Sequence, residues 1–497
     1  MAFLVLILLL LCHGLSGYGL LTLFGIRQRA AVIGALSLIL GVAVASFIPF
    51  LLQLCWVQLT PATVFLSLVL ACLLLNIRTL LPAGKAGEFS VRSIRGRLSR
   101  FFRECGVRVR GFRLLPYEVP FVVILGFLIF VSVWRCYYLP PTSRDALSGP
   151  EAIAEYAVRE HTMINSFFTV DLWTTNNQFK SPFLISLQII YKMAGFPFGQ
   201  IWLSVLFVSF IVLLYQVLKE RLHPIIAGVL LLLFMMAPEL YAYTFMILYD
   251  YSNMLFLFLS LYFLFEYCKS KTPATLHFAG LLMGIATYVR SETLVLALFF
   301  LPIILLMQRR EKYGYRQMAV SCVLFLLPAV IGYYLPVQLY VAHYLPVHYA
   351  VAGQVNQHLS DLEPLFKRYA DMGSRLLTGE LAIHLWGYFM FVWAALFVAE
   401  AVFLRRFSRD ARNWLYAIFS ILIGLGLLGY LLPLFNLMET TKRGMFKLLP
   451  LMLLYMANSE WLLRLSTWIS RWENAVPAAA VKASASPVQV SGKKGRK

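Results

Sequence analysis

Long apolar runs recur along the whole chain, and they constrain the fold more than any other feature. A helix needs about 20 apolar residues to cross the hydrocarbon core of a membrane. Only 13% of the residues are charged, whereas soluble globular chains contain about 25%. The sequence therefore predicts an all-α polytopic membrane protein and excludes a soluble multidomain enzyme. About thirteen transmembrane helices are expected, near residues 2–25, 30–54, 61–81, 117–139, 201–218, 224–246, 250–267, 274–289, 292–308, 317–340, 384–404, 413–435 and 445–466.

The basic residues indicate how these spans are oriented. The chain has 43 Lys and Arg against 23 Asp and Glu, and 31 of the 43 basic residues fall into one alternating set of loops and the C-terminal tail. Because Lys and Arg collect in cytoplasmic loops, this set should face the cytoplasm, with the N-terminus outside. The charge excess then needs no nucleic-acid partner. Residues 92–113 would contact anionic membrane lipids, and a bacterial inner (plasma) membrane is the expected location.

The spans and loops divide the chain into four parts. The first outer loop should carry surface helices, and the tail, rich in Lys, Ser and Gly, should be disordered. The expected parts are an N-terminal three-helix membrane module (1–81), a basic cytoplasmic loop (82–116), a transmembrane core (117–466) with outer loops at 135–200 and 341–384, and a cytoplasmic tail (467–497).

The first outer loop begins with an acidic residue just before a predicted surface helix. Ser148 and Glu151 have the spacing of a capping box, and Pro150 suits a first helical turn. Asp145 therefore lies at the membrane edge, where a carboxylate can act as general base toward a hydroxyl delivered from outside. The alternative interpretation is a solvated loop carboxylate paired with Arg144.

A second acid and three cations lie at the ends of other spans on the same side. Asp250 begins a span and is either a functional group or a helix N-cap. Arg290, Lys442 and Arg443 go against the positive-inside bias, which binding of an anionic phosphate would explain. Snorkelling is the alternative, or, for Arg290, pairing with a neighbouring acid, Glu292.

The histidines and cysteines do not form a metal-ligand pattern. The seven Cys include no C-x-x-C pair, and His343, His348 and His358 are spaced five and ten residues apart. This spacing does not place them on one helical face, as a zinc site would need. We therefore predict no metal-binding residues, while Mg or Mn as a cofactor is left open.

Together these positions resemble the GT-C superfamily of membrane glycosyltransferases, such as protein O-mannosyltransferases and bacterial transferases that modify lipid A with aminoarabinose. The resemblance covers roughly residues 117–466. Asp145 follows the first core span, and Asp250 begins a later one. Residues 284–290 are similar to Gly-Leu-Ala-x-Leu-Thr-Arg/Lys, and residues 443–450 to an Arg-Tyr-Leu-Leu-Pro run. Several members have an Asp-Glu pair in the first loop, where this chain has Asp145 followed by Ala146.

The resemblance implies an inverting transfer of a sugar from a polyprenyl-phosphate-linked donor to a hydroxyl of a lipid, glycan or protein acceptor on the outer face. An O-antigen polymerase or ligase is one alternative. A lipid or sugar flippase is the other, although it would use charges near the bilayer midplane. The expected roles are catalytic base for Asp145, donor-phosphate binding for Arg290, Arg443 and Lys442, and substrate binding for Asp250, Arg144, Glu151 and Lys180.

Overall fold

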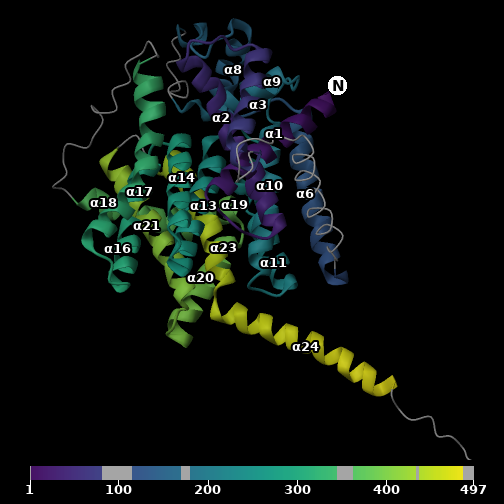
Figure 1. Cartoon of the computed structure of the whole chain (residues 1–497). Coiled ribbons are helices and arrows are strands. Elements are labelled where there is room, and N and C mark those ends of the chain that lie inside the picture. Colours follow the sequence, from purple (N-terminus) through teal and green to yellow (C-terminus); the bar gives the residue numbers. More distant parts are fainter. Residues whose placement is uncertain (1, 81–114, 170–179, 344–361, 433–435, 485–497) are drawn as a thin grey trace, which may run out of the picture.

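The computed structural model describes residues 2–80, 115–169, 180–343, 362–432 and 436–484. Within these ranges the chain forms helices and connecting turns, and it contains no strand. Most of the helices run roughly along one direction as a bundle (Figure 1). The predicted all-α fold is therefore confirmed for the described residues.

Eight helical segments in the described ranges are long and apolar enough to cross a membrane. A ninth candidate is bent by 110° between α19 (Glu380–Trp386) and the segment Phe389–Leu404, which contains α20 (Phe389–Ala399). The eight are α1 (Ala2–Leu23), α2 (Ala30–Leu54), α6 (Val119–Tyr138), α10 (Ile201–Lys219), α13 (Tyr249–Ser270), α15 with α16 (Thr293–Leu298, Leu301–Arg310), α17 (Tyr315–Tyr334, continued by a π-helix Leu335–Ala342) and α21 (Arg409–Leu431).

The remaining predicted spans are shorter or interrupted. The last one, expected at 445–466, is broken between α23 (Leu449–Ala457) and α24 (Glu460–Ser484). Helix α24 leaves the bundle (Figure 1), and it includes residues 467–484, which were expected to be disordered. The shorter apolar helices are α3 (Pro61–Leu75), α9 (Pro182–Met193), α11 (Pro224–Met235) and α14 (Pro273–Val289).

Close helix packing explains how the central helices keep their positions. Helix α13 is almost entirely buried, and α14 packs against both α13 and α17. A Cβ atom at Gly284 would lie 2.6 Å from the carbonyl oxygen of Pro328, and one at Gly332 would lie 2.2 Å from that of Gly284. Small residues allow helix backbones to approach this closely within a membrane. The α14–α17 contact therefore depends on glycine at both positions.

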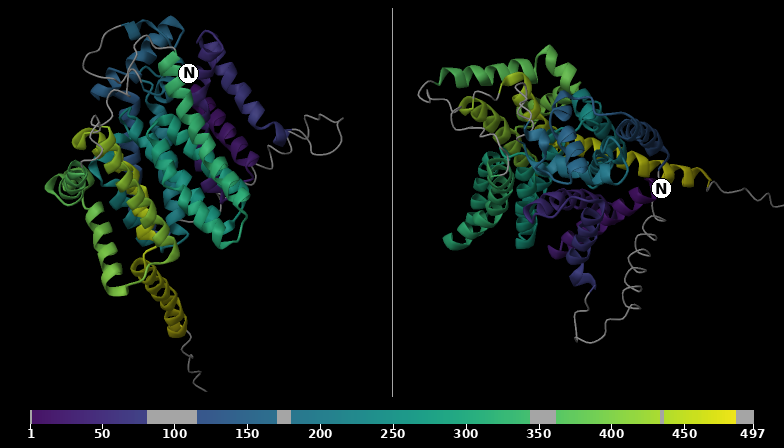
Figure 2. Two further views of the ribbon diagram at one scale, coloured as in Figure 1. Left: turned by 90° about the vertical axis from the view of Figure 1, so that its left-hand side faces the viewer. Right: turned by 90° about the horizontal axis from the view of Figure 1, so that it is seen from above.

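The predicted N-terminal module packs directly against the core. Helix α2 contacts α9 and α10, and both views in Figure 2 show the N-terminal helices against the teal core helices. His13 on α1 forms a buried hydrogen bond of 3.0 Å with the hydroxyl of Tyr191 on α9. Helices α1 and α2 of this module therefore share an interface with the core.

Three short helices cover one end of the bundle. They are α7 (Arg144–Leu147), α8 (Pro150–Glu160) and α9, and Figure 1 shows α8 and α9 at the end opposite α24. Helix α8 has buried Ile153, Ala154 and Ala157 on one face, as expected for a helix lying on a surface. The segment predicted to be the first outer loop thus carries helices.

Candidate active site

Asp145 is presented by the short helix α7 and contacts a cation from the far end of the sequence. The Ser143 hydroxyl caps α7 by accepting from the Ala146 backbone N–H at 3.2 Å. Arg443, on α22 (Lys442–Gly444), donates from Nη1 to Oδ2 of Asp145 at 2.5 Å. The Asp145 side chain is 24% exposed. This carboxylate is therefore anchored by a cation while still open to solvent.

Asp250 belongs to a second, more deeply buried group of charges. It lies in the first turn of α13, where Leu248 is the N-cap, so the N-cap interpretation of Asp250 is wrong. Its side chain is 2% exposed and accepts a hydrogen bond from Nη1 of Arg290. The Arg290 Nε atom lies 2.6 Å from Glu292, and Lys447 Nζ lies 3.6 Å from the same carboxylate. The proposed Arg290–Glu292 pair is thus present, but Arg290 also bridges to Asp250.

The two groups lie close enough for their charges to interact. Asp250 acts electrostatically on Arg443, and the charges of Arg290, Asp145, Asp250 and Arg443 all act on the amine of Lys180. Burial lowers the pKa of Lys180 to about 8; the charges of Arg290 and Arg443 also lower this pKa, whereas those of Asp145 and Asp250 raise it. The structure therefore brings together five of the predicted site residues.

Local contacts fix the elements that carry these charges. Lys180 Nζ lies 5.8 Å from the ring centroid of Tyr249, whose hydroxyl donates to the carbonyl of Ser181 at 2.8 Å. The Asn253 amide donates to the Ala286 carbonyl at 2.7 Å and to the Thr293 hydroxyl at 2.8 Å. The two contacts of Asn253 together tie α13 to both sides of the turn that holds Arg290.

Lys442 forms an ion pair next to the cluster. Its Nζ lies 2.6 Å from Glu239, which is in the first turn of α12 (Pro238–Tyr243). Tyr243, at the end of α12, packs against Phe446 with a centroid separation of 4.3 Å. Sequence reasoning assigned no role to Glu239 or Lys447, and it considered Glu292 only as a partner of Arg290. Lys447 could have been identified, because an ionisable residue within a predicted span is rarely there without a partner or function.

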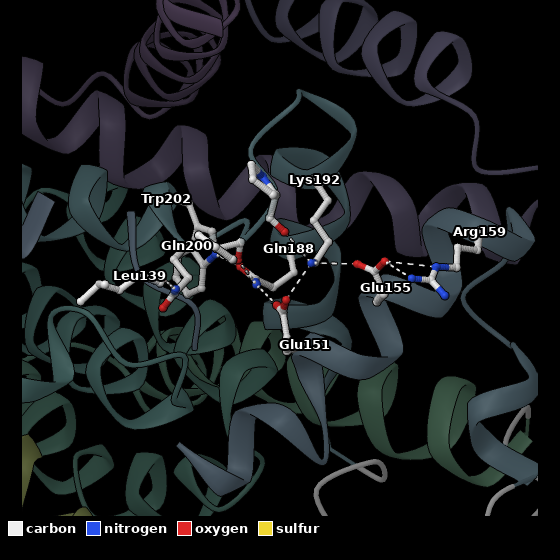
Figure 3. A network of polar contacts seen from close by, with 10 residues as sticks. Leu139, Glu151, Glu155, Arg159, Gln188, Lys192, Gln200 and Trp202 are labelled. Atoms are coloured by element: carbon white, nitrogen blue, oxygen red, sulfur yellow. Dashed lines mark hydrogen bonds and ion pairs between the residues drawn. The ribbon is translucent and has the colours of Figure 1, made fainter. Parts of the chain in front are cut away.

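Glu151 contacts α9 and does not cap α8. Gly149 is the N-cap of α8 and makes no side-chain cap, so the predicted capping box with Ser148 is wrong. Glu151 instead forms an ion pair with Lys192 at 2.7 Å and accepts from Gln188 Nε2 at 2.5 Å (Figure 3). Burial raises the pKa of Glu151, although Lys192 and Gln188 oppose the increase. Its predicted role in substrate binding stays a prediction, as does that of the exposed Arg144.

The contacts of Glu151 are part of a network that joins α8 to α9 and α10. Glu155 pairs with Lys192 at 3.0 Å and with Arg159, four residues further along α8, at 2.8 Å. The indole N–H of Trp202 on α10 donates to Gln188 Oε1 at 2.8 Å (Figure 3). Because α7 immediately precedes α8, this network also fixes the element that carries Asp145.

No group of three or more His, Cys, Asp or Glu side chains is arranged to hold a metal ion in the part of the chain that the structure describes. His348 and His358, which the sequence argument considered as ligands, lie outside the described residues. The described cluster instead offers amino and guanidinium groups, which suit an anionic ligand.

Residues 182–334 match the family model described as dolichyl-phosphate-mannose-protein mannosyltransferase. This chain is a membrane glycosyltransferase of the GT-C type. Neither the curated proteins nor the solved structures gave a match. The matched segment of the glycosyltransferase includes Asp250 and Arg290 with the helices that position them, whereas Asp145 and Arg443 lie outside it.

Proposed function

We propose that this glycosyltransferase moves a sugar from a polyprenyl-phosphate-linked donor to a hydroxyl of a lipid, glycan or protein acceptor at the outer face of the bacterial inner membrane. The name of the matched family includes dolichyl-phosphate-mannose, a sugar linked to a polyprenyl phosphate, as the donor. The candidate site lies at one end of an apolar bundle, where a lipid-linked substrate and a water-soluble group can meet.

The composition of the cluster is the observation that carries the proposal. It contains three carboxylates and four cations among its described members, so one positive charge is in excess. The members are Asp145, Asp250, Glu292, Lys180, Arg290, Arg443 and Lys447. A phosphate leaving group gains negative charge in the transition state, and fixed cations stabilise that charge most effectively in a site with little water.

In the proposed reaction, a carboxylate oxygen of Asp145 takes the proton of the acceptor hydroxyl while the acceptor oxygen attacks the anomeric carbon of the donor. The bond between this carbon and the phosphate oxygen breaks, and its electron pair leaves with the phosphate. Attack opposite the leaving group inverts the anomeric centre. Asp145 suits the base better than Asp250, because its side chain is 24% exposed whereas that of Asp250 is 2% exposed and held by Arg290.

The cations have separate tasks in this proposal. Arg443 contacts the candidate base and therefore connects donor binding with activation of the acceptor. Arg290 is oriented by Asp250 and Glu292, so that its charge is fixed before the donor arrives. Lys180 and Lys442 supply further positive charge to the donor phosphate, with Lys442 held by Glu239. Asp250 is thus a positioning residue for Arg290.

Arg443→Ala tests the phosphate-binding role without leaving a fully buried acid unpaired, because Asp145 is partly exposed. Loss of a charged hydrogen bond of about 1.5–3 kcal/mol should raise the KM for the lipid-linked donor roughly tenfold to hundredfold. Arg443→Lys should recover part of the affinity, since a point charge replaces a planar fork of donors. Arg159→Ala is the control, because this exposed arginine lies outside the cluster. An unchanged KM in Arg443→Ala would remove Arg443 from donor binding.

The outer-face assignment is tested by topology reporters. A reporter that is active only in the cytoplasm should give a signal when fused after Lys497 and none when inserted near Gln357. The reverse result would place the cluster on the cytoplasmic side and contradict the proposed reaction site.

A further inference from the structure

A cavity lies at the end of the bundle opposite the candidate active site. Helix α13 begins beside the site at Tyr249, and α14 returns toward it from Pro273, so the turn between them is at the far end. The cavity has a volume of about 510 Å³ and is lined from α13, α14, α16 and α17 and the turns beside them. Its lining includes Lys271, His277, Gln308, Tyr313, Arg316 and Leu324.

A buried amide in this cavity has an unused acceptor. The Gln308 side chain is 1% exposed, and its Nε2 donates to the Tyr267 hydroxyl at 2.8 Å and to the Ser321 hydroxyl at 2.7 Å. No hydrogen-bond donor among the described residues reaches its Oε1 atom. Leaving a buried acceptor unsatisfied costs free energy, so a ligand that donates a hydrogen bond there would be favoured.

The mouth of the cavity carries basic side chains. Lys271 and Arg316 are exposed, and His277, which also lines the cavity, is half-buried. Lys271 forms an ion pair with Glu311 at 2.7 Å. Arg316 forms no ion pair with any residue that the structure describes, and it therefore supplies positive charge that is not offset. This arrangement favours an anion at the mouth.

One wall of the cavity is apolar and continues onto the outside of the bundle. Leu276 is buried, whereas Val320 and Leu324 on α17 are 49% and 37% exposed. Val323 and Leu327 extend this exposed apolar surface along the same helix. A ligand with a phosphate at the mouth would therefore have room for a hydrocarbon chain along α17. A soluble phosphate compound has no such chain and would leave this apolar surface uncovered.

We propose that this cavity binds an anionic phospholipid whose headgroup carries a hydroxyl. The phosphate contacts Arg316 and Lys271, the headgroup hydroxyl donates to Gln308 Oε1, and an acyl chain lies along α17. Basic pockets between membrane helices are suited to such headgroups. The site is distinct from the candidate active site and does not depend on the proposed transfer reaction.

Binding of short-chain lipids to the full-length, delipidated protein in detergent tests this site. Dioctanoyl phosphatidylglycerol should bind more tightly than dioctanoyl phosphatidylcholine, and Arg316→Gln should weaken its binding about tenfold. Arg310→Gln is the matched control, because Arg310 is exposed at the end of α16 but does not line the cavity. Gln308→Leu should remove the preference for phosphatidylglycerol over dioctanoyl phosphatidic acid, which lacks the extra hydroxyl, while anion binding persists.

Two results would overturn the proposal. Equal losses in Arg316→Gln and Arg310→Gln would show that diffuse positive charge attracts the lipid, without a defined pocket. Equal affinity for glycerol 1-phosphate, which has no acyl chains, would show that the ligand is a soluble phosphate compound. Because binding is measured directly, a failed transferase assay has no effect on either conclusion.

Discussion

Replacing Lys192 with methionine should destabilise the packing of α8 against α9 and displace Asp145. Lys192 is 6% exposed and lies 2.7 Å from Glu151, which is 14% exposed. The methionine side chain fills a similar space but leaves the buried carboxylate without its cation. Since α8 follows α7 directly, a shift of α8 would also move the candidate base.

The size of the effect follows from the contacts that remain. Breaking a buried ion pair by removing one partner costs about 3–5 kcal/mol. Glu151 keeps its hydrogen bond from Gln188, so we expect the lower part of this range, about 3 kcal/mol. The lost contact with Glu155 adds little, because Glu155 is 41% exposed and such pairs contribute about 0–1 kcal/mol.

The destabilisation should depend on pH in a defined direction. The pKa of Glu151 is raised in the folded protein, mainly by burial, and loss of Lys192 would raise it further. A raised pKa favours folding at low pH, where the carboxyl is protonated, and this contribution is lost as pH rises through the folded pKa. The cost of Lys192→Met should therefore be smallest below the pKa of a free glutamate, about 4.3, and largest above the raised pKa of the folded protein.

Unfolding in mixed detergent micelles, followed by tryptophan fluorescence, measures this effect. Lys192→Met, Glu151→Gln and the double variant form a thermodynamic cycle. The double variant should be less destabilised than the sum of the single variants, because it removes both charges of the pair and leaves neither buried without its partner. Additive effects, or a cost of Lys192→Met that is independent of pH, would refute the buried-pair argument.

Three further predictions concern charge and packing. If the Lys180 ammonium binds the donor phosphate, the KM for donor should rise above pH 8, where this group with a pKa of about 8 loses its proton, and Lys180→Arg should abolish that increase. A flat pH profile in the parent enzyme would argue against it. Gly284→Leu should prevent folding, whereas Gly126→Leu, which meets open space, should yield normal amounts of folded protein in detergent. Glu239→Gln should weaken donor binding less than Lys442→Ala, since it removes only the partner of the cation, and equal donor affinities in both variants would contradict this order.

The sequence was sufficient for the membrane fold and for several residues of the cluster. Long apolar runs can satisfy their backbone hydrogen bonds in a bilayer only as helices or closed barrels, and their length favours helices. Acids and cations at span ends are costly without a partner or function, so Asp145, Asp250, Arg290 and Arg443 could be selected individually. Their order along the chain then suggested the glycosyltransferase family.

The partner of each charge could not be predicted, because it depends on which span ends meet. The sequence suggested the neighbouring Arg144 as an alternative partner of Asp145, but the fold brings Arg443 to it across 298 positions. Likewise, the local capping pattern at Glu151 was overridden by a tertiary contact with Lys192. Spans were also predicted too long where proline or charged residues end helices early, as in α11 and α23.

Turnover of Asp145→Asn at saturating donor and acceptor tests the central claim most directly. Asparagine keeps the size and a hydrogen-bond acceptor for Arg443 but cannot take the acceptor proton. General base catalysis contributes about 10²–10⁴-fold, so kcat should fall by that factor, with donor affinity little changed. Asp371→Asn, an exposed acid paired with Arg375, is the control and should retain normal turnover. Near-normal transfer by Asp145→Asn, together with loss of transfer in Glu151→Gln, would contradict the account and assign the base to the surface helix α8.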